Sequence, residues 1–239
     1  MRPDPVGSHF NEVAPEYDRW KQKAHRYYAA LKSSLREVIP PKSRVLEVGC
    51  ATDDILASLD PTEGVGLDIS PAMIELASRK HPELRFRVHD LMQGPIDERF
   101  DYAVAADVAE HVPDLDTMMG SLADMLTGRG IAVVVTANPL WAPILYMAER
   151  LRLKMPEGDH EWRSRTDLAG AARRVGLRER SFDRSLVVPK DIPGFRALDS
   201  AAWAAGLRQR VGLIQRAVFE RPLGDPREAA TRPIEGGRA

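Results

Sequence analysis

The sequence predicts an α/β fold built on a mostly parallel sheet, and two segments carry this prediction. Residues 44–54 have the pattern of an apolar strand containing Glu47, followed by a turn at Gly49 and by capping residues that open a helix. About 20 residues further on, a second strand ends at Asp68, as the acidic residue of a nucleotide-binding βαβ unit does. Such an acid hydrogen-bonds ribose hydroxyls. We therefore expect a nucleoside ligand at the carboxyl ends of these strands.

The composition limits the chain to one α/β core and excludes several functional classes. With 239 residues, 44% of them hydrophobic, the chain can bury one full core but no second domain. The formal net charge is −1, so no field of the whole protein attracts nucleic acid or an anionic membrane. The single cysteine, Cys50, excludes a disulfide framework and fits a reducing compartment. No long uncharged apolar run occurs, so we expect no transmembrane segment and a soluble, cytoplasmic protein.

The amino-terminal part predicts a flexible leader over residues 1–9 and a helical cap over residues 10–40. The cap has more aromatic side chains than a solvated helix needs, namely Phe10, Tyr17, Trp20, Tyr27 and Tyr28. Two interpretations remain open, because these rings could pack on the sheet or cover the ligand site. Pro40 and Pro41 end the helix and precede the first strand.

From residue 44 onward, strand and helix patterns alternate. Strands are expected at 44–48, 64–69, 85–89, 101–106 and 130–136. Helices are expected to start at about residues 53, 71 and 114. This alternation requires parallel strands joined by right-handed crossovers, and ligands of such sheets bind at the carboxyl ends of the strands. The residues expected at those ends are Glu47 to Gly49, Asp68, Asp90 and Asp107.

Residues 139–162 predict an amphipathic insertion after the fifth strand. Apolar residues recur at helical spacing, and Arg150, Arg152 and Lys154 cluster at the far end. One interpretation is a core-facing helix with cations at its carboxyl end, where the helix dipole favours them. The other is a lid that contacts an apolar or lipid-linked acceptor.

The remaining segments predict the second edge of the sheet. A helix over 166–175 leads to a strand over 177–188, and a final strand is expected at 213–220. The helical insertion at 190–210 separates these two strands. The sheet then has seven strands, and residues 223–239 have the composition of a disordered tail.

The turn after the first strand favours a ligand that has no pyrophosphate. A dinucleotide-binding turn uses several glycines, whereas Ala51 and Asp53 stand where further glycines would be. An acid at the start of a helix would repel a pyrophosphate but would tolerate an ammonium group. S-adenosylmethionine is such a ligand, since its adenosine suits Asp68 and its cationic amino-acid end suits the turn.

Three stretches resemble motifs of the class I S-adenosylmethionine-dependent methyltransferases. They are Val-Leu-Glu-Val-Gly-Cys-x-Thr-x-Asp, Gly-Leu-Asp-Ile-Ser-Pro-x-Met-Ile and Phe-Asp-Tyr-Ala-Val-Ala-Ala-Asp-Val-x-Glu-His-Val. The resemblance implies a single Rossmann-like domain over residues 10–222, whose seven-stranded, mostly parallel sheet ends in an antiparallel edge hairpin made of the last two strands. The domain would bind S-adenosylmethionine and act on a small-molecule acceptor, not on nucleic acid. The residues expected to bind the cofactor are Tyr17, Glu47, Gly49, Cys50, Ala51, Asp53, Asp68, Ile69, Met73, Asp90, Leu91 and Asp107.

Methyl transfer is an in-line displacement, and a hydroxyl acceptor needs a base near the transferred methyl group. The candidate bases are His111 and His160. Both lie in strings that resemble the O-methyltransferases of ubiquinone biosynthesis, some of which bind a divalent cation at the first string. That resemblance leaves open a metal-assisted reaction at Asp107, Glu110 and His111, beside the interpretation without a metal. Other stretches resemble methyltransferase domains found beside polyprenyl-linked glycosyltransferases, which leaves the acceptor open.

The first motif departs from the family pattern Glu-x-Gly-x-Gly-x-Gly, because only Gly49 of its glycines remains. If Ala51 must adopt a positive φ, its methyl group costs on the order of 1 kcal/mol. Two functional hypotheses follow. The first is methyl transfer from S-adenosylmethionine to a hydroxyl, with an amine as the less favoured acceptor. The second is a non-catalytic scaffold or sensor that keeps the methyltransferase fold.

Overall fold

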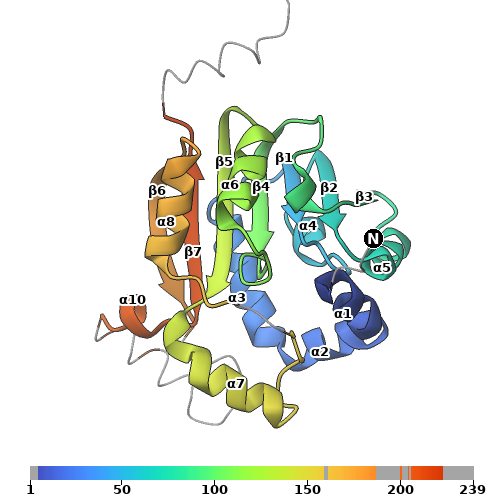
Figure 1. The fold of residues 1–239 in the computed structure, drawn as a ribbon, viewed down its shortest axis with the longest axis vertical. Coiled ribbons are helices and arrows are strands. Elements are labelled where there is room, and N and C mark those ends of the chain that lie inside the picture. Colours follow the sequence, from blue (N-terminus) through green and yellow to red (C-terminus); the bar gives the residue numbers. More distant parts are fainter. Residues whose placement is uncertain (1–4, 159–160, 187–199, 201–203, 205, 223–239) are drawn as a thin grey trace, which may run out of the picture.

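The computed structural model describes residues 5–158, 161–186, 200, 204 and 206–222. Seven strands form one sheet in the order β3-β2-β1-β4-β5-β7-β6 (Figure 1). Their bounds are Arg44–Val48 (β1), Glu63–Asp68 (β2), Arg85–Val88 (β3), Phe100–Ala106 (β4), Leu126–Ala137 (β5), Arg178–Ser185 (β6) and Ile214–Glu220 (β7). β7 pairs antiparallel with β5 and β6, and the other neighbouring strands are parallel. The predicted sheet with its antiparallel edge hairpin is therefore confirmed.

Helices cover both faces of this sheet and its lower edge. Their bounds are Pro5–Val13 (α1), Tyr17–Lys23 (α2), His25–Arg36 (α3), Ile55–Ser58 (α4), Pro71–Lys80 (α5), Leu115–Asp124 (α6), Ala142–Arg150 (α7), Arg165–Arg174 (α8) and Arg208–Val211 (α10). Short 3-10 turns lie at Ala14–Glu16 (η1), Leu91–Gln93 (η2) and Pro139–Trp141 (η3). The apolar side chains of α3 and α4 pack on one face of the sheet, and those of α6 and α8 pack on the other.

The amino-terminal segment differs from the prediction in two ways. A helix begins at Pro5, not at Phe10, so residues 5–9 are not a loose leader. Packing explains this, because Gly7 lies against Ile69 and the Asn11 side chain accepts hydrogen bonds from Ser70 Oγ at 2.7 Å and Ala72 N at 3.2 Å. The predicted single helix is also divided into α1, α2 and α3. Pro15, which has no N–H to donate, lies at the first of these breaks.

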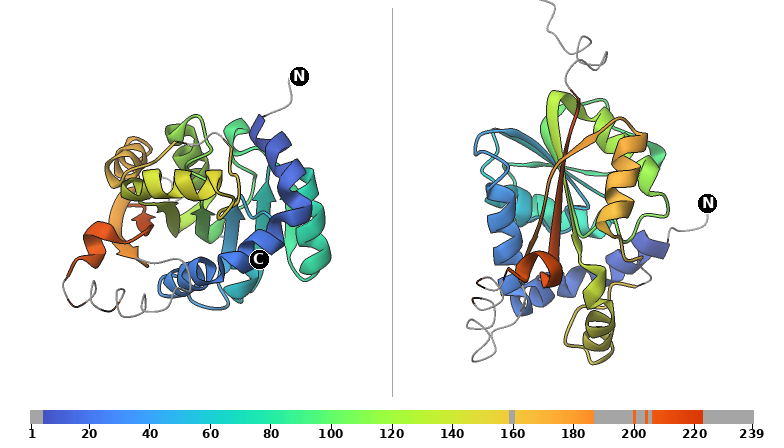
Figure 2. Two further views of the ribbon diagram at one scale, coloured as in Figure 1. Left: turned by 90° about the horizontal axis from the view of Figure 1, so that it is seen from below. Right: turned by 90° about the vertical axis from the view of Figure 1, so that its left-hand side faces the viewer.

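The segments α1, α2 and α7 lie beyond the carboxyl ends of the parallel strands, at the lower end of the molecule in Figure 1 and in the right-hand view of Figure 2. None of the residues of α7 is buried, which contradicts the core-facing interpretation of the 139–162 segment. Most of the 190–210 insertion, residues 1–4 and 187–188, and the tail at 223–239 lie outside the described residues.

Candidate active site

Two adjoining cavities open where the parallel strands end. The larger, of about 640 Å³, is bordered by the ends of β1, β2 and β4 and by α1, and we call it the strand-end cavity. The smaller, of about 390 Å³, lies between α2, α3, α7 and the segment that follows α7, and we call it the aromatic cavity. Seven residues line both cavities, and we call them the shared wall: Lys21, Tyr28, Asp107, Glu110, His111, Met155 and Glu157. The two cavities are therefore adjacent.

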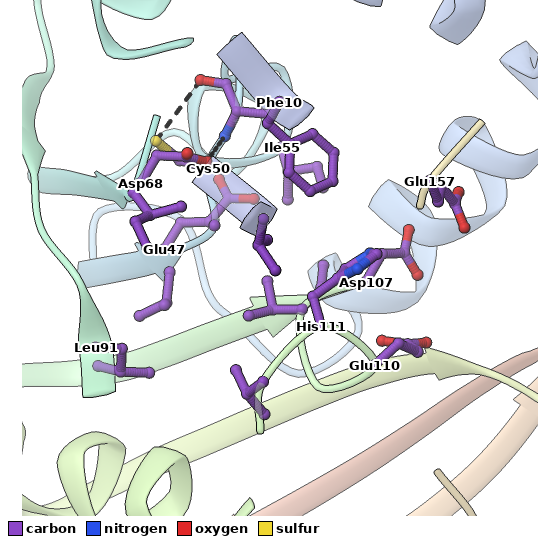
Figure 3. A pocket seen from close by; sticks show the side chains of 18 of the residues that line it. Phe10, Glu47, Cys50, Ile55, Asp68, Leu91, Asp107, Glu110, His111 and Glu157 are labelled. Atoms are coloured by element: carbon purple, nitrogen blue, oxygen red, sulfur yellow. Dashed lines mark hydrogen bonds between the residues drawn. The ribbon is translucent and has the colours of Figure 1, made fainter. Parts of the chain in front are cut away.

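Most of the predicted ligand residues line the strand-end cavity. They are Tyr17, Glu47, Gly49, Cys50, Ala51, Asp68, Ile69, Asp90, Leu91 and Asp107. Figure 3 shows that Cys50 and Asp68 lie toward one end of this cavity, whereas Asp107, Glu110 and His111 lie toward the other. The cavity volume of about 640 Å³ is within the range of small-molecule sites.

The turn after β1 has positive φ at Gly49 and also at Ala51 and Asp53, the two positions where the family pattern has further glycines. Gly49 has φ +66°, and a Cβ there would lie 2.3 Å from Val108 Cγ2, so only glycine fits. Ala51 and Asp53 also have positive φ, at +47° and +45°. Such angles cost about 1 kcal/mol or more for a residue with a side chain. The surrounding structure must therefore enforce this turn.

Asp68 holds the turn in place. Its Oδ2 accepts a hydrogen bond from Ala51 N at 2.9 Å, and its Oδ1 accepts one from Ser70 N at 2.8 Å. Burial raises the pKa of Asp68, although these two backbone donors favour its charged form. The carboxylate has lone pairs to spare and borders the cavity, as the ribose-binding acid of such a sheet must.

Asp53 and Met73 do not line the cavity, contrary to the prediction. The positive φ of Asp53 turns its fully buried carboxylate beneath the turn, where Oδ1 accepts a hydrogen bond from Ala57 N at 3.4 Å. Its Oδ2 has no hydrogen-bond partner within the described part of the chain. The neighbouring Glu47 carboxylate accepts from Leu56 N at 2.9 Å, and burial raises the pKa of both acids. Met73 is fully buried below Ala51 and belongs to the core.

Asp54 takes the place in the cavity lining that was expected of Asp53. Its carboxylate pairs with Lys21 Nζ at 2.5 Å and with Lys80 Nζ at 2.6 Å. Burial by itself would raise the pKa of Asp54, but Lys21 and Lys80 hold that pKa down at about 2. Lys21 also lies over the rings of Tyr17 and Tyr28, at 5.3 and 5.6 Å from their centroids. The cavity therefore has a cation and an anion beside the altered turn.

The shared wall has a buried carboxyl group, that of Glu110, and a partly buried one, that of Asp107. Asp107 Oδ1 accepts a hydrogen bond from the Tyr27 hydroxyl at 2.6 Å, and burial raises the pKa of Asp107 to about 6. Glu110 Oε1 accepts from Ala137 N at 3.0 Å, while its Oε2 is buried and has no hydrogen-bond partner among residues that the structure describes. Burial, together with the nearby Asp107 charge, raises the pKa of Glu110 to about 8. Both groups are therefore able to accept or release a proton near neutral pH.

Of the two candidate bases, His111 lies in the shared wall. Its ring contacts Phe10 edge-to-face, with 5.3 Å between the centroids. His160 lies outside the described residues, although the backbone of its neighbour Glu161 donates a hydrogen bond to Glu110 O at 2.8 Å. Across the described ranges, no three His, Cys, Asp or Glu side chains are grouped to hold a metal ion. The structure thus does not support the metal-assisted alternative at Asp107, Glu110 and His111.

The aromatic cavity lies between the predicted cap and the 139–162 segment, where the lid interpretation places an apolar acceptor, although most of its lining residues were not predicted individually. Its lining is mainly aromatic and aliphatic: Trp20, Tyr27, Tyr28, Trp141, Ile144, Leu145, Ala148, Leu153, Met155, Trp162 and Leu213. Large flat side chains of this kind favour a ligand with an apolar, aromatic body. The signals available in the sequence were the aromatics of the cap and the apolar spacing in residues 139–162, which now meet across this cavity.

Comparisons with known proteins agree with this architecture. A family model described as a methyltransferase domain matches residues 19–181. Two similar curated proteins are named as ubiquinone biosynthesis O-methyltransferases. The one from Bradyrhizobium diazoefficiens is 30% identical over 128 residues, and the one from Azorhizobium caulinodans is 31% identical over 131 residues. Each match covers 50% of this chain and 51% of the relative, so the chain spans about half the length of these curated relatives.

Solved structures share the fold at low identity. A possible histamine N-methyltransferase from Thermotoga maritima has a TM-score of 0.71 and 16% identity, and the match covers 91% of this chain and 100% of that one. A putative methyltransferase in complex with the Haloferax volcanii Trm112 activator has a TM-score of 0.70 and 21% identity, with 89% and 97% covered. These likenesses establish the architecture of the sheet and its helices.

Proposed function

The chain belongs to the methyltransferase domain family and its cofactor is S-adenosylmethionine, and from this premise we propose that it methylates a hydroxyl group of a small molecule with an apolar, aromatic body. One observation carries the proposal. The cavity built by the strand ends and the cavity built by aromatic side chains meet at a wall that has Asp107, Glu110 and His111. Methyl transfer needs this arrangement, because the donor and the acceptor must approach each other in line.

The residues of the strand-end cavity fit the chemical groups of the cofactor. In this proposal Asp68 binds the ribose hydroxyls, and Asp90 and Leu91, which line the same cavity, bind the adenine. Asp54 and Lys21 offer opposite charges to the ammonium and carboxylate groups of the amino-acid end. Gly49 borders the cavity, and only glycine fits there because a Cβ would clash with Val108. When bound, the cofactor supplies the methyl group on a sulfonium.

The acceptor occupies the aromatic cavity in this proposal, with its hydroxyl toward the shared wall. Tyr28 and Met155 line both cavities and help to keep water away from the point of transfer. His111 takes the hydroxyl proton as general base. The free oxygen of Glu110 accepts a hydrogen bond from the same hydroxyl or from a second one. The curated relatives, which are named as O-methyltransferases, also support oxygen as the methylated atom.

Two experiments test this proposal. The first is calorimetric titration of the purified protein with S-adenosylhomocysteine, for which we expect a dissociation constant in the micromolar range. The second is incubation with S-adenosylmethionine labelled in its methyl group and a panel of apolar phenols and amines. Label transfer to phenols supports the proposal, and transfer to amines alone would contradict it. Absence of binding up to millimolar cofactor would instead favour the non-catalytic scaffold, in which Ala51 and Asp53 have removed cofactor binding.

A further inference from the structure

Helix α7 and its flanks carry an unusual concentration of exposed apolar side chains. Leu140, Ile144, Met147 and Leu151 follow one another at intervals of three or four residues, so they form a stripe along the helix. Leu151 is 62% exposed and Met147 is 54% exposed. With Tyr146 and Leu153, these residues form what we call the α7 face. It includes most of the large exposed hydrophobic residues in the described part of the chain.

The charges that border the α7 face are basic. Arg150 and Arg152 are exposed beside the stripe, and Arg150 lies 5.8 Å from the centre of the Tyr146 ring. The nearby acidic side chains are partly buried and have partners, since Glu149 accepts a hydrogen bond from Glu157 N and Glu157 pairs with Lys154. An apolar stripe flanked by arginines is the pattern of a helix that lies in the surface of an anionic membrane. The near-neutral charge of the whole chain does not reveal this local surface.

The α7 face is continuous with the aromatic cavity. Ile144 is 58% exposed and Leu153 is 52% exposed, yet both also line the cavity. The cavity therefore opens at the edge of the exposed face. Helix α7 itself lies at the lower end of the molecule and projects away from the sheet (Figure 1). An apolar acceptor could pass between a lipid layer and the cavity along side chains that are apolar throughout.

We propose that the α7 face binds the surface of a phospholipid bilayer that contains anionic lipids, with the apolar stripe inserted among the acyl chains and the arginines at the headgroups. The binding is peripheral, because no described helix is long and apolar enough to cross a bilayer. The lipid contact itself does not depend on methyl transfer. The entry of an acceptor from the lipid, in contrast, rests on the proposed function.

Vesicle flotation of the full chain tests this inference, with phosphatidylcholine vesicles compared with vesicles that also contain phosphatidylglycerol. We expect binding to the anionic vesicles with a partition constant on the order of 10⁴ M⁻¹, and at least about tenfold weaker binding to the neutral ones. The double variant Met147→Gln/Leu151→Gln, whose positions do not line the cavity, should lower binding about tenfold or more. Arg150→Glu/Arg152→Glu should remove the preference for anionic lipid.

Matched controls separate the α7 face from general surface effects. Leu207→Gln changes an exposed leucine elsewhere, and Arg99→Glu/Arg173→Glu makes the same charge change at exposed positions elsewhere. Both controls should float like the unchanged protein, and all variants should bind S-adenosylhomocysteine alike. Flotation that the α7 variants do not alter would refute the proposal. So would light scattering that shows an α7-dependent dimer without lipid binding. Failure of methyl transfer appears separately, as loss of cofactor binding or turnover.

Discussion

The two cavities of this site are built in different ways. The strand-end cavity is formed largely by consecutive residues at the ends of β1 and β2, where Gly49 and Asp68 are fixed by the turn and by backbone hydrogen bonds. The aromatic cavity is formed by side chains of α2, α3, α7 and the segment after α7, which the sheet does not position directly. The strand ends of the sheet thus form the strand-end cavity directly, whereas helices and loops outside the sheet form most of the aromatic cavity. This difference explains how one fold can keep its cofactor while its acceptor varies.

The largest expected effect concerns proton removal at the shared wall. Replacing His111 with Asn should lower kcat by about 10²- to 10⁴-fold on an acceptor found in the methyl-transfer screen, because the general base is lost. The affinity for S-adenosylhomocysteine should change by less than about threefold, since the base does not hold the cofactor. His9→Asn, outside both cavity linings, is the control. If Glu110→Gln is inactive while His111→Asn still turns over, the carboxyl group is the base.

A second variant tests whether Asp68 holds the cofactor in the strand-end cavity. Asp68→Ala should weaken S-adenosylhomocysteine binding about 100-fold, because charge-assisted hydrogen bonds are worth about 1.5–3 kcal/mol and Ala51 N and Ser70 N also lose their acceptor. Calorimetry measures the affinity, and circular dichroism checks that the variant is folded. The exposed Asp116→Ala serves as control. Unchanged affinity in a folded Asp68→Ala protein would show that the nucleoside lies elsewhere.

The buried carboxyl group of Glu110 should make stability depend on pH. Burial raises its pKa to about 8 in the folded state, so the folded protein holds a proton that the unfolded chain has already released. The stabilisation that this bound proton gives the folded state is fully present below the ordinary glutamate pKa of about 4.3 and is lost as the pH rises through about 8. The free energy of unfolding should fall by roughly 4 kcal/mol between pH 5 and pH 9, at about 1.36 kcal/mol for each pH unit between 5 and 8.

Urea unfolding at several pH values measures this contribution. Glu110→Gln removes the titrating group and should flatten the pH dependence relative to the unchanged protein. The exposed Glu161→Gln should not. If the free energy of unfolding changes with pH in the same way for the unchanged protein and Glu110→Gln, the pKa of the Glu110 carboxyl group is not raised in the folded state.

The smallest expected effect concerns the altered turn. Asp53→Gly should raise the free energy of unfolding by about 1–2 kcal/mol, because it relieves a positive φ and removes a buried carboxylate that lies against Glu47. Asp60→Gly is a matched control, since Asp60 also has positive φ, at +50°, but an exposed side chain. Thermal unfolding of both variants separates backbone strain from the buried charge. Equal stabilisation would mean that the charge of Asp53 contributes nothing.

The sequence predicted the parts of the molecule that local patterns determine. Hydrophobic alternation located all seven strands, and Ser70 with Pro71 marked the start of α5, where Ser70 Oγ accepts a hydrogen bond from Met73 N. Local patterns also predicted Gly49 and Asp68 as ligand-site residues, and both line the strand-end cavity. These features follow from periodicity, capping and glycine geometry, which a single stretch of sequence contains.

Features that depend on three-dimensional contacts were missed. Asp53 was misplaced because its side-chain direction follows from a positive φ that residue type alone does not specify. Lys21 and Glu157 reach the shared wall from segments far apart in the chain, and no motif links them. The early start of α1 depends on the contact of Gly7 with Ile69, which overrides the weak helix propensity of Pro-Val-Gly.

A crystal structure with bound S-adenosylhomocysteine tests the central claim most directly, because the claim concerns how the two cavities meet. We predict that the ribose hydroxyls contact Asp68 and that the sulfur faces the shared wall, toward His111 and the opening to the aromatic cavity. A sulfur directed away from this wall, or a ligand bound outside the strand-end cavity, would contradict the account.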